Sequence, residues 1–174
     1  MMTEYTAINL QTMDYNENDS KLVLLSTSGI VYAILKGVKK PTAKLKQANL
    51  PFACGIYTIA SNTNIITSFE SIQSFGWIVN DYDKYIHASI ACEACMLCKY
   101  DKDTTNILLE LLALFRGLLA DNYADSLSQF LTKLLSYLGY CDDYSNASLI
   151  EILTQLQYNT ETELKSVRLL QCTK

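Results

Sequence analysis

The sequence has few of the residues and patterns on which catalytic and membrane proteins depend. Its 174 residues include one histidine, two prolines and six glycines. No apolar run approaches the roughly 20 residues that a helix needs to cross a bilayer, and the first residues lack the charged and apolar regions of a signal peptide. We therefore expect a cytoplasmic protein without membrane association, whose six cysteines are reduced thiols and not a disulfide framework.

Recognisable catalytic motifs are also missing. Lys36-Gly37-x-x-Lys40 lacks the first glycine and the Gly-Lys-Ser/Thr end of a phosphate-binding Walker loop. No Gly-x-Ser-x-Gly turn is present, and a single histidine leaves little from which to build a catalytic triad. The adjacent acids Asp142 and Asp143 fall in a polar turn and are interpreted as solvated. The sequence therefore predicts a protein that is not an enzyme and that needs no cofactor.

One cysteine cluster, Cys92, Cys95 and Cys98, has the spacing of metal ligands. Metal sites with this spacing usually need a loop and a fourth ligand nearby, whereas this run continues an apolar helix and no cysteine or histidine follows closely. Because cysteine also packs as a small apolar side chain, we interpret the run as core packing and predict no metal. A metal site is the alternative, and His87 is interpreted as a structural or surface histidine.

The most informative feature is a reversal of charge within one segment. The chain has a net charge of −4, yet residues 36–46 contain five lysines and no acid. Six lysines and five acids give residues 1–80 a charge of +1, whereas eight basic and thirteen acidic residues give residues 81–174 a charge of −5. A cluster of cations on a rigid sheet suits a polyanion. The alternative is that these lysines only solubilise an exposed loop and protect a sheet edge.

The first half of the chain has the pattern of a strand-rich domain. Short runs of alternating or β-branched apolar residues predict strands at residues 5–13, 20–26, 30–35, 55–60 and 65–69. The second and third runs are joined by Ser26-Thr27-Ser28-Gly29, which is typical of a hairpin. Gly37 and Pro41 then end the third run. Short strands with regularly spaced turns favour a small closed barrel, with the OB-fold as the leading candidate.

From about Trp77 the apolar pattern takes a helical period. Helices are predicted over residues 80–99, 104–119, 126–138 and 149–156, with Asp103 or Thr104 as the cap of the second. The second helix has an apolar stripe too wide for a solvent-facing helix, so it should lie inside a bundle. This stripe consists of Ile107, Leu108, Leu111, Leu112, Phe115, Leu118 and Leu119. The predicted fold class is α+β: a five-stranded OB-fold β-barrel at residues 1–75, followed by an α-helical bundle at residues 76–174.

Several short pieces occur along the chain in a distinctive order. They are Ala7-Ile8-x-Leu10, the segment from Asp14 to Val23, the hairpin with Gly29, Lys36-Gly37-Val38-Lys39-Lys40-Pro41, Leu50-Pro51-Phe52 and, in the helical half, Leu138-Gly139-Tyr140. Together these pieces resemble the bacterial recombination mediator family RecO, over about residues 5–140. Many members carry a four-cysteine zinc cluster after the last piece. This chain has only Cys141 there.

The resemblance implies a non-enzymatic DNA repair and recombination mediator. Such a protein binds single- and double-stranded DNA through the OB-fold and anneals complementary strands. It works with a RecR-like mediator and single-stranded-DNA-binding protein to load recombinase, in the cytoplasm and associated with the nucleoid. The alternative is a protein-interaction adaptor that kept the RecO-like fold and has weak or no DNA binding.

Candidate DNA-binding residues follow from the basic segment and from this resemblance. The expected phosphate contacts are Lys36, Lys39, Lys40, Lys44 and Lys46. Tyr32, Phe52 and Tyr57 could stack on bases, as aromatic side chains of OB-folds do. Each of these three rings could equally fill the barrel core, and for any single one of them core packing is the expectation.

Overall fold

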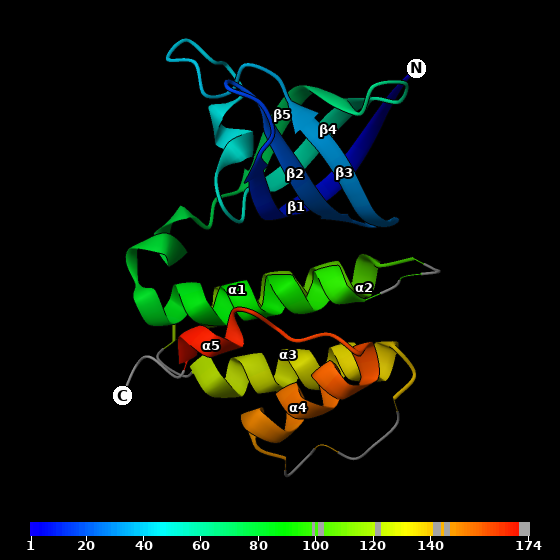
Figure 1. The fold of residues 1–174 in the computed structure, drawn as a ribbon, viewed down its shortest axis with the longest axis vertical. Coiled ribbons are helices and arrows are strands. Elements are labelled where there is room, and N and C mark those ends of the chain that lie inside the picture. Colours follow the sequence, from blue (N-terminus) through cyan, green and yellow to red (C-terminus); the bar gives the residue numbers. More distant parts are fainter. Residues whose placement is uncertain (99, 101–102, 121–122, 141–143, 145–146, 171–174) are drawn as a thin grey trace. The chain divides into compact units, whose positions relative to one another are not determined.

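The computed structural model contains two compact units. It describes residues 1–98, 100, 103–120, 123–140, 144 and 147–170. Residues 1–77 and 100–108 form one unit, called the barrel unit here, and residues 78–99 and 109–174 form the other, the helical unit. The barrel unit therefore includes a short segment, residues 100–108, that the sequence pattern assigned to the helical bundle. Figure 1 shows the strands of the first unit and the helices of the second.

Five strands form a closed barrel in the order β1-β2-β3-β5-β4. The strands are β1 (Met2–Asp14), β2 (Ser20–Ser26), β3 (Gly29–Leu35), β4 (Cys54–Ala60) and β5 (Ile65–Gln73). Strand β1 is long enough to pair with β4 along its first half and with β2 along its second half. The predicted OB-fold is confirmed. β1 and β5 both extend further than the sequence pattern indicated.

Apolar side chains that alternate along the strands fill the barrel interior. The fully or almost fully buried members of this core include Ala7, Leu22, Leu24, Ala33, Leu35, Tyr57, Ile59 and Ile66. The Tyr57 hydroxyl donates a hydrogen bond of 2.9 Å to the carbonyl oxygen of Ala53. Burial raises the pKa of Tyr57, so its polar end stays neutral and has a partner. The Tyr57 hydroxyl is therefore buried with a hydrogen-bond partner, as buried polar groups usually are.

The β2–β3 turn passes through Thr27 and Ser28, as predicted. Gly29 follows with a φ of +111°, a backbone conformation that residues with a side chain rarely adopt. Thr104 binds this turn: its Oγ1 donates to the Ser26 carbonyl oxygen at 2.6 Å and accepts from the Gly29 N–H at 2.8 Å. Its own N–H donates to the Thr27 carbonyl oxygen at 3.0 Å. The sequence suggested Thr104 as a helix cap, whereas its side chain is used to hold the turn.

Within the described residues the structure has five α-helices and two short 3-10 helices. They are α1 (Tyr82–Leu97), α2 (Thr105–Gly117), α3 (Tyr123–Tyr137), α4 (Leu149–Thr160), α5 (Val167–Leu170), η1 (Lys46–Asn49) and η2 (Gly76–Asn80). α3 packs against α1 and α4, and α5 packs against α1. The side chain of Asp81 caps α1, and Ser148 with Glu151 forms a capping box at the start of α4. The capping hydrogen bonds from Ser148 lower the pKa of Glu151.

The apolar stripe of the second predicted helix is only partly buried. Leu111 and Phe115 have no exposed surface, as expected. Leu112 is half-buried, and the prediction was wrong for Leu119, which is 65% exposed. The reason is that α2 ends at Gly117, so Leu119 follows the helix and does not continue its buried face.

The cysteine run lies on α1 and at its end. Cys92, Cys95 and Cys98 are buried free thiols, and the Cys98 thiol donates to the Ala94 carbonyl oxygen at 3.0 Å. Burial raises the pKa of Cys92, so this side chain packs as a neutral thiol, in line with the core-packing interpretation. Across the part of the chain that the structure describes, no three His, Cys, Asp or Glu side chains gather as a metal site would need. Cys141 lies outside the described residues.

Candidate nucleic-acid interface

The basic segment, residues 36–46, is an exposed loop with an apolar anchor. Val38 is 4% exposed and belongs to the barrel core, and Leu45 packs against that core. Gly37 has a φ of +64°, which lets the chain turn sharply after β3. All five lysines of this loop are exposed. The alternation of anchored apolar residues and exposed lysines fixes the loop on the barrel while the charges face solvent.

The basic loop is also tied to the β1–β2 turn, residues 15–19. The Gly37 N–H donates to the Asp19 carboxylate at 2.8 Å, and the Lys39 N–H donates to the Asn18 carbonyl oxygen at 3.2 Å. The Asn16 side chain donates to the other Asp19 oxygen at 3.0 Å. Hydrogen bonds from Asn16 and then Gly37 lower the pKa of Asp19, assisted by the nearby charges of Lys36 and Lys40. In Figure 1 the two connections lie at the same end of the barrel.

The five lysines differ in what they contact. Lys39 forms an ion pair of 2.7 Å with Asp14, and the Lys46 ammonium donates to the Pro41 carbonyl oxygen at 2.6 Å. Lys36, Lys40 and Lys44 have no ion-pair partner within the described residues. The structure thus divides the predicted set into two engaged lysines and three that are available to an external anion.

The three aromatic candidates also differ, because one ring is exposed and two are buried. Tyr32 is 53% exposed on β3, and the Lys21 ammonium lies 5.3 Å from the centroid of its ring. Phe52 is 3% exposed and Tyr57 is fully buried, so for both rings the structure shows the core-packing alternative, and neither face is open to a base. Lys21 was missed by the sequence reasoning. The signal was its place on β2, beside Ile34 in register and diagonal to Tyr32.

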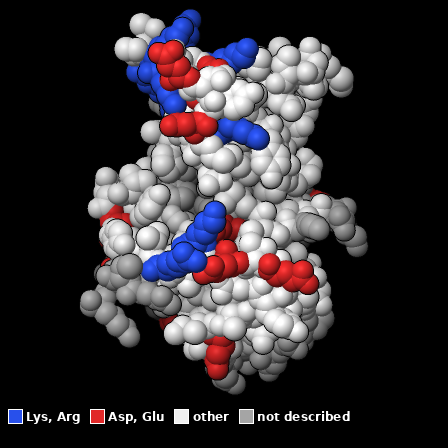
Figure 2. Space-filling model, viewed as in Figure 1, with Lys and Arg blue, Asp and Glu red and all other residues white. Residues whose placement is uncertain are grey.

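Most basic side chains described in the helical unit are already paired. The ion pairs are Lys84 with Asp81 at 3.5 Å, Lys133 with Glu110 at 2.7 Å, and Arg168 with Glu163 at 2.9 Å. On the face drawn in Figure 2, lysine side chains gather on the barrel unit, with acidic side chains beside them. Among the described residues, lysines without an ion-pair partner are therefore concentrated in the basic loop.

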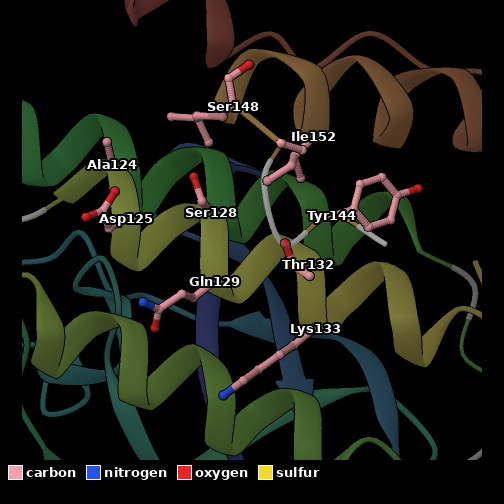
Figure 3. Close-up of a pocket in the computed structure, with 11 residues that line it drawn as sticks. Ala124, Asp125, Ser128, Gln129, Thr132, Lys133, Tyr144, Ser148 and Ile152 are labelled. Carbon is pink, nitrogen blue, oxygen red and sulfur yellow. The ribbon is translucent and has the colours of Figure 1, made fainter. Parts of the chain in front are cut away.

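The helical unit has a hollow of its own between α3 and α4. It has a volume of about 480 Å³ and is lined mainly by short polar and apolar side chains. In Figure 3, Ser128 and Thr132 lie on α3 along one side of the hollow, Ser148, which caps α4, and Ile152 of α4 lie along the other side, and the Lys133 side chain points away. The Lys133 ammonium is held by Glu110.

Comparisons with known proteins agree with this architecture. Residues 1–75 match the family model described as Recombination protein O N terminal. The chain is 31% identical over 148 residues to DNA repair protein RecO of Heliobacterium modesticaldum, an alignment that covers 80% of this chain and 52% of that protein. It is 30% identical over 160 residues to the protein of the same name from Clostridium kluyveri, covering 87% of this chain and 62% of the relative. The chain belongs to the RecO family.

This RecO-family chain is similar to only part of its relatives. A third one, DNA repair protein RecO of Clostridium novyi, is 37% identical over 95 residues, which is 52% of this chain and 37% of the relative. The chain thus spans about half the length of the curated relatives that it matches. The region that the family model covers contains all five strands, the basic loop, Lys21 and Tyr32. No helix within the described residues has both the length and the apolar character of a membrane span.

Proposed function

We propose that this RecO-family chain acts in DNA repair and recombination by binding DNA through its barrel unit. The observation that carries this proposal is the group of three exposed lysines without an ion-pair partner among the described residues: Lys36, Lys40 and Lys44. They project from a loop anchored by Val38 and by the Gly37–Asp19 hydrogen bond. Fixed cations of this kind bind phosphates without regard to sequence, because binding releases counterions from the DNA.

Tyr32 and Lys21 extend this surface onto β2 and β3. Tyr32 exposes about half of its surface, with the Lys21 ammonium near its ring. An exposed ring beside a cation can stack on a base while the cation contacts a phosphate. The proposed interface is therefore the basic loop together with these two residues.

The role proposed for the bound DNA is that of a mediator and not of an enzyme. By family likeness, the protein would anneal complementary strands and help to load recombinase, together with a RecR-like mediator and single-stranded-DNA-binding protein. The names of the relatives, DNA repair protein RecO, support a repair role. We place the DNA contacts on the barrel and leave the helical unit for protein partners, because its described cations are mostly paired.

Replacing Lys36, Lys40 and Lys44 together by Ala tests this proposal. On single-stranded DNA each lost phosphate contact lowers the salt slope by about 0.7, so three lost contacts should lower it by roughly 2. The affinity should fall to a similar extent for oligonucleotides of different sequence. Titration of labelled single-stranded and duplex DNA at several salt concentrations measures both quantities.

A charge-matched variant of the helical unit is the control. Replacing the exposed Lys133, Lys165 and Arg168 by Ala changes the net charge by the same amount, and it should leave the salt slope unchanged. Equal losses in both variants would mean that overall charge, and not the loop, governs binding. If the parent protein binds no DNA at low salt, the adaptor function is the better description.

A further inference from the structure

The barrel closes between β3 and β5 through very little strand pairing. The two strands pair in parallel through one residue pair, Ile34 with Ile65, and the Ile34 N–H donates to the Asn64 carbonyl oxygen at 2.8 Å. After Ile66, β5 continues to Gln73 with β4 as its pairing partner on one side. One edge of β5 is therefore not covered by a neighbouring strand over most of its length.

A hollow of about 360 Å³, called the β5 furrow here, lies along this open edge. One wall is formed by the basic loop, including Lys36 and Lys44, and the other by β5, including Thr67, Ser68 and Phe69. A neighbouring hollow of about 250 Å³ between β5 and residues 47–53 also includes Phe69. A bound chain could thus continue past Phe69.

Phe69 has an unusual place in the barrel. Its ring lies 4.7 Å from the Tyr57 ring, centroid to centroid, and packs against the barrel core. It remains partly exposed, because β3 does not extend over this part of β5. Tyr57 is also the register partner of Phe69 on β4. Two residues before it on that strand is Gly55, where an added Cβ would lie 2.6 Å from the Phe69 ring. The close approach of β4 at Gly55 therefore holds one side of the Phe69 ring in place. The other side of the ring lines the furrow.

The furrow thus combines two cations and an aromatic ring within one small space. A nucleotide has the matching parts, which are a phosphate and a flat base. In a duplex each base is stacked and paired, so only an unpaired base can turn its face to a ring in a pocket. Resting on the proposed DNA binding, we infer that the β5 furrow is a subsite for one unpaired nucleotide, with its base on Phe69 and its phosphate between Lys36 and Lys44.

An extended acidic peptide is the other occupant that an open strand edge suggests. One observation disfavours it. The β4–β5 register shifts at Thr58/Ile59, beside Thr67, and such a bulge interrupts the regular hydrogen bonding that an added strand requires. An unpaired nucleotide needs no regular backbone pairing.

The test uses the variant Phe69→Leu and three probes: an oligothymidylate of about 12 nucleotides, the same strand with abasic sites throughout, and a duplex of equal length. Losing a base–aromatic contact should weaken binding to oligothymidylate roughly 5- to 100-fold. Binding to the abasic strand and to the duplex should stay unchanged, as should the salt slope. Leucine keeps an apolar contact with Tyr57, and circular dichroism confirms that the variant is folded. Ile72→Ala, an exposed change on the same strand, is the control and should have no effect.

The parent protein alone provides a second measurement. It should bind oligothymidylate more tightly than the abasic strand, and Phe69→Leu should remove most of that difference, whereas Tyr32→Leu should remove less. Equal affinity of the parent for both strands, or an equal loss on all three probes in Phe69→Leu, would overturn the nucleotide subsite while DNA binding itself stands. A parent that binds none of the probes would overturn the proposed function as well. An acidic peptide that binds the parent and not Phe69→Leu, with DNA affinity unchanged, would assign the furrow to a protein partner.

Discussion

The connections at the two ends of β3 differ in the burial of their polar groups. At its start, the β2–β3 turn has no charged side chain, and both Ser26 and Thr104 are almost completely buried. At its end, the basic loop exposes five lysines. Only seven residues separate the two connections. A short strand thus links a turn whose hydrogen bonds are used within the fold to a loop whose charges are turned outward.

This difference separates stability from binding. Buried N–H and C=O groups need hydrogen-bond partners, because each unsatisfied group lowers the free energy of unfolding. Exposed lysines contribute little to stability but determine the local electrostatic potential. Changes at the β2–β3 turn should therefore lower the free energy of unfolding without altering DNA affinity. Changes in the basic loop should lower DNA affinity without altering the free energy of unfolding.

The largest stability effect is expected from Thr104→Val. Valine has the shape of threonine without its hydroxyl, so the buried Gly29 N–H and Ser26 carbonyl oxygen lose the partner that now binds both. Leaving such groups unsatisfied should lower the free energy of unfolding by about 1–3 kcal/mol, measured by urea denaturation. Thr58→Val is the matched control, because the Thr58 hydroxyl contacts Ser68 at an exposed site. A Thr104→Val loss no larger than that of the control would show that the turn is not held by this side chain.

A much smaller effect on stability is expected from the triple change of Lys36, Lys40 and Lys44 to Ala. The free energy of unfolding should change by no more than about 0.5 kcal/mol, as is usual for exposed sites without special contacts. The same denaturation experiment measures it. A loss above about 1 kcal/mol would mean that these lysines help to hold the loop, and the division of roles between the two ends of β3 would not stand.

Much of the fold could be predicted from the sequence because the deciding signals are local. Alternating apolar residues specified the strands, Gly29 marked the hairpin turn, and the helical period beyond Trp77 indicated the bundle. The helix ends could not be predicted in the same way. Leu119 continued the apolar pattern of α2, yet the helix ends before it at Gly117.

The candidate site could be predicted only as a set of residue types. Which lysines are free depends on Asp14, which lies 25 residues from Lys39 in sequence and 2.7 Å from it in space. The role of Thr104 depends on Ser26, at a sequence separation of 78 residues. Phe69 looked like any other strand residue, because its partial exposure results from how little of β5 pairs with β3. Which side chains are paired or exposed depends on contacts between residues distant in sequence, and a local sequence pattern does not predict such contacts.

The smallest expected effect concerns the acid beside the basic loop, in the variant Asp19→Asn. An amide oxygen can still accept from the Gly37 N–H, so the loop should keep its position while one negative charge is lost. Because hydrogen bonds from Asn16 and Gly37 hold the pKa of Asp19 below its ordinary value of 3.8, the ionised carboxylate is favoured in the folded state. Its contribution to stability is therefore present above pH 3.8 and is lost as the pH falls through the lowered pKa.

Unfolding curves of parent and Asp19→Asn should accordingly differ slightly near neutral pH and converge in acid. Glu17→Gln removes the same charge from the same turn without such hydrogen bonds among the described residues, so it is the charge-matched control. Both variants reduce the negative potential near Lys36 and Lys40 and should tighten DNA binding at low salt. If Asp19→Asn and Glu17→Gln show the same pH dependence, the carboxylate of Asp19 does not hold the basic loop in place. The basic loop would then be held in place by Val38, by Leu45 and by the hydrogen bond between Lys39 and Asn18.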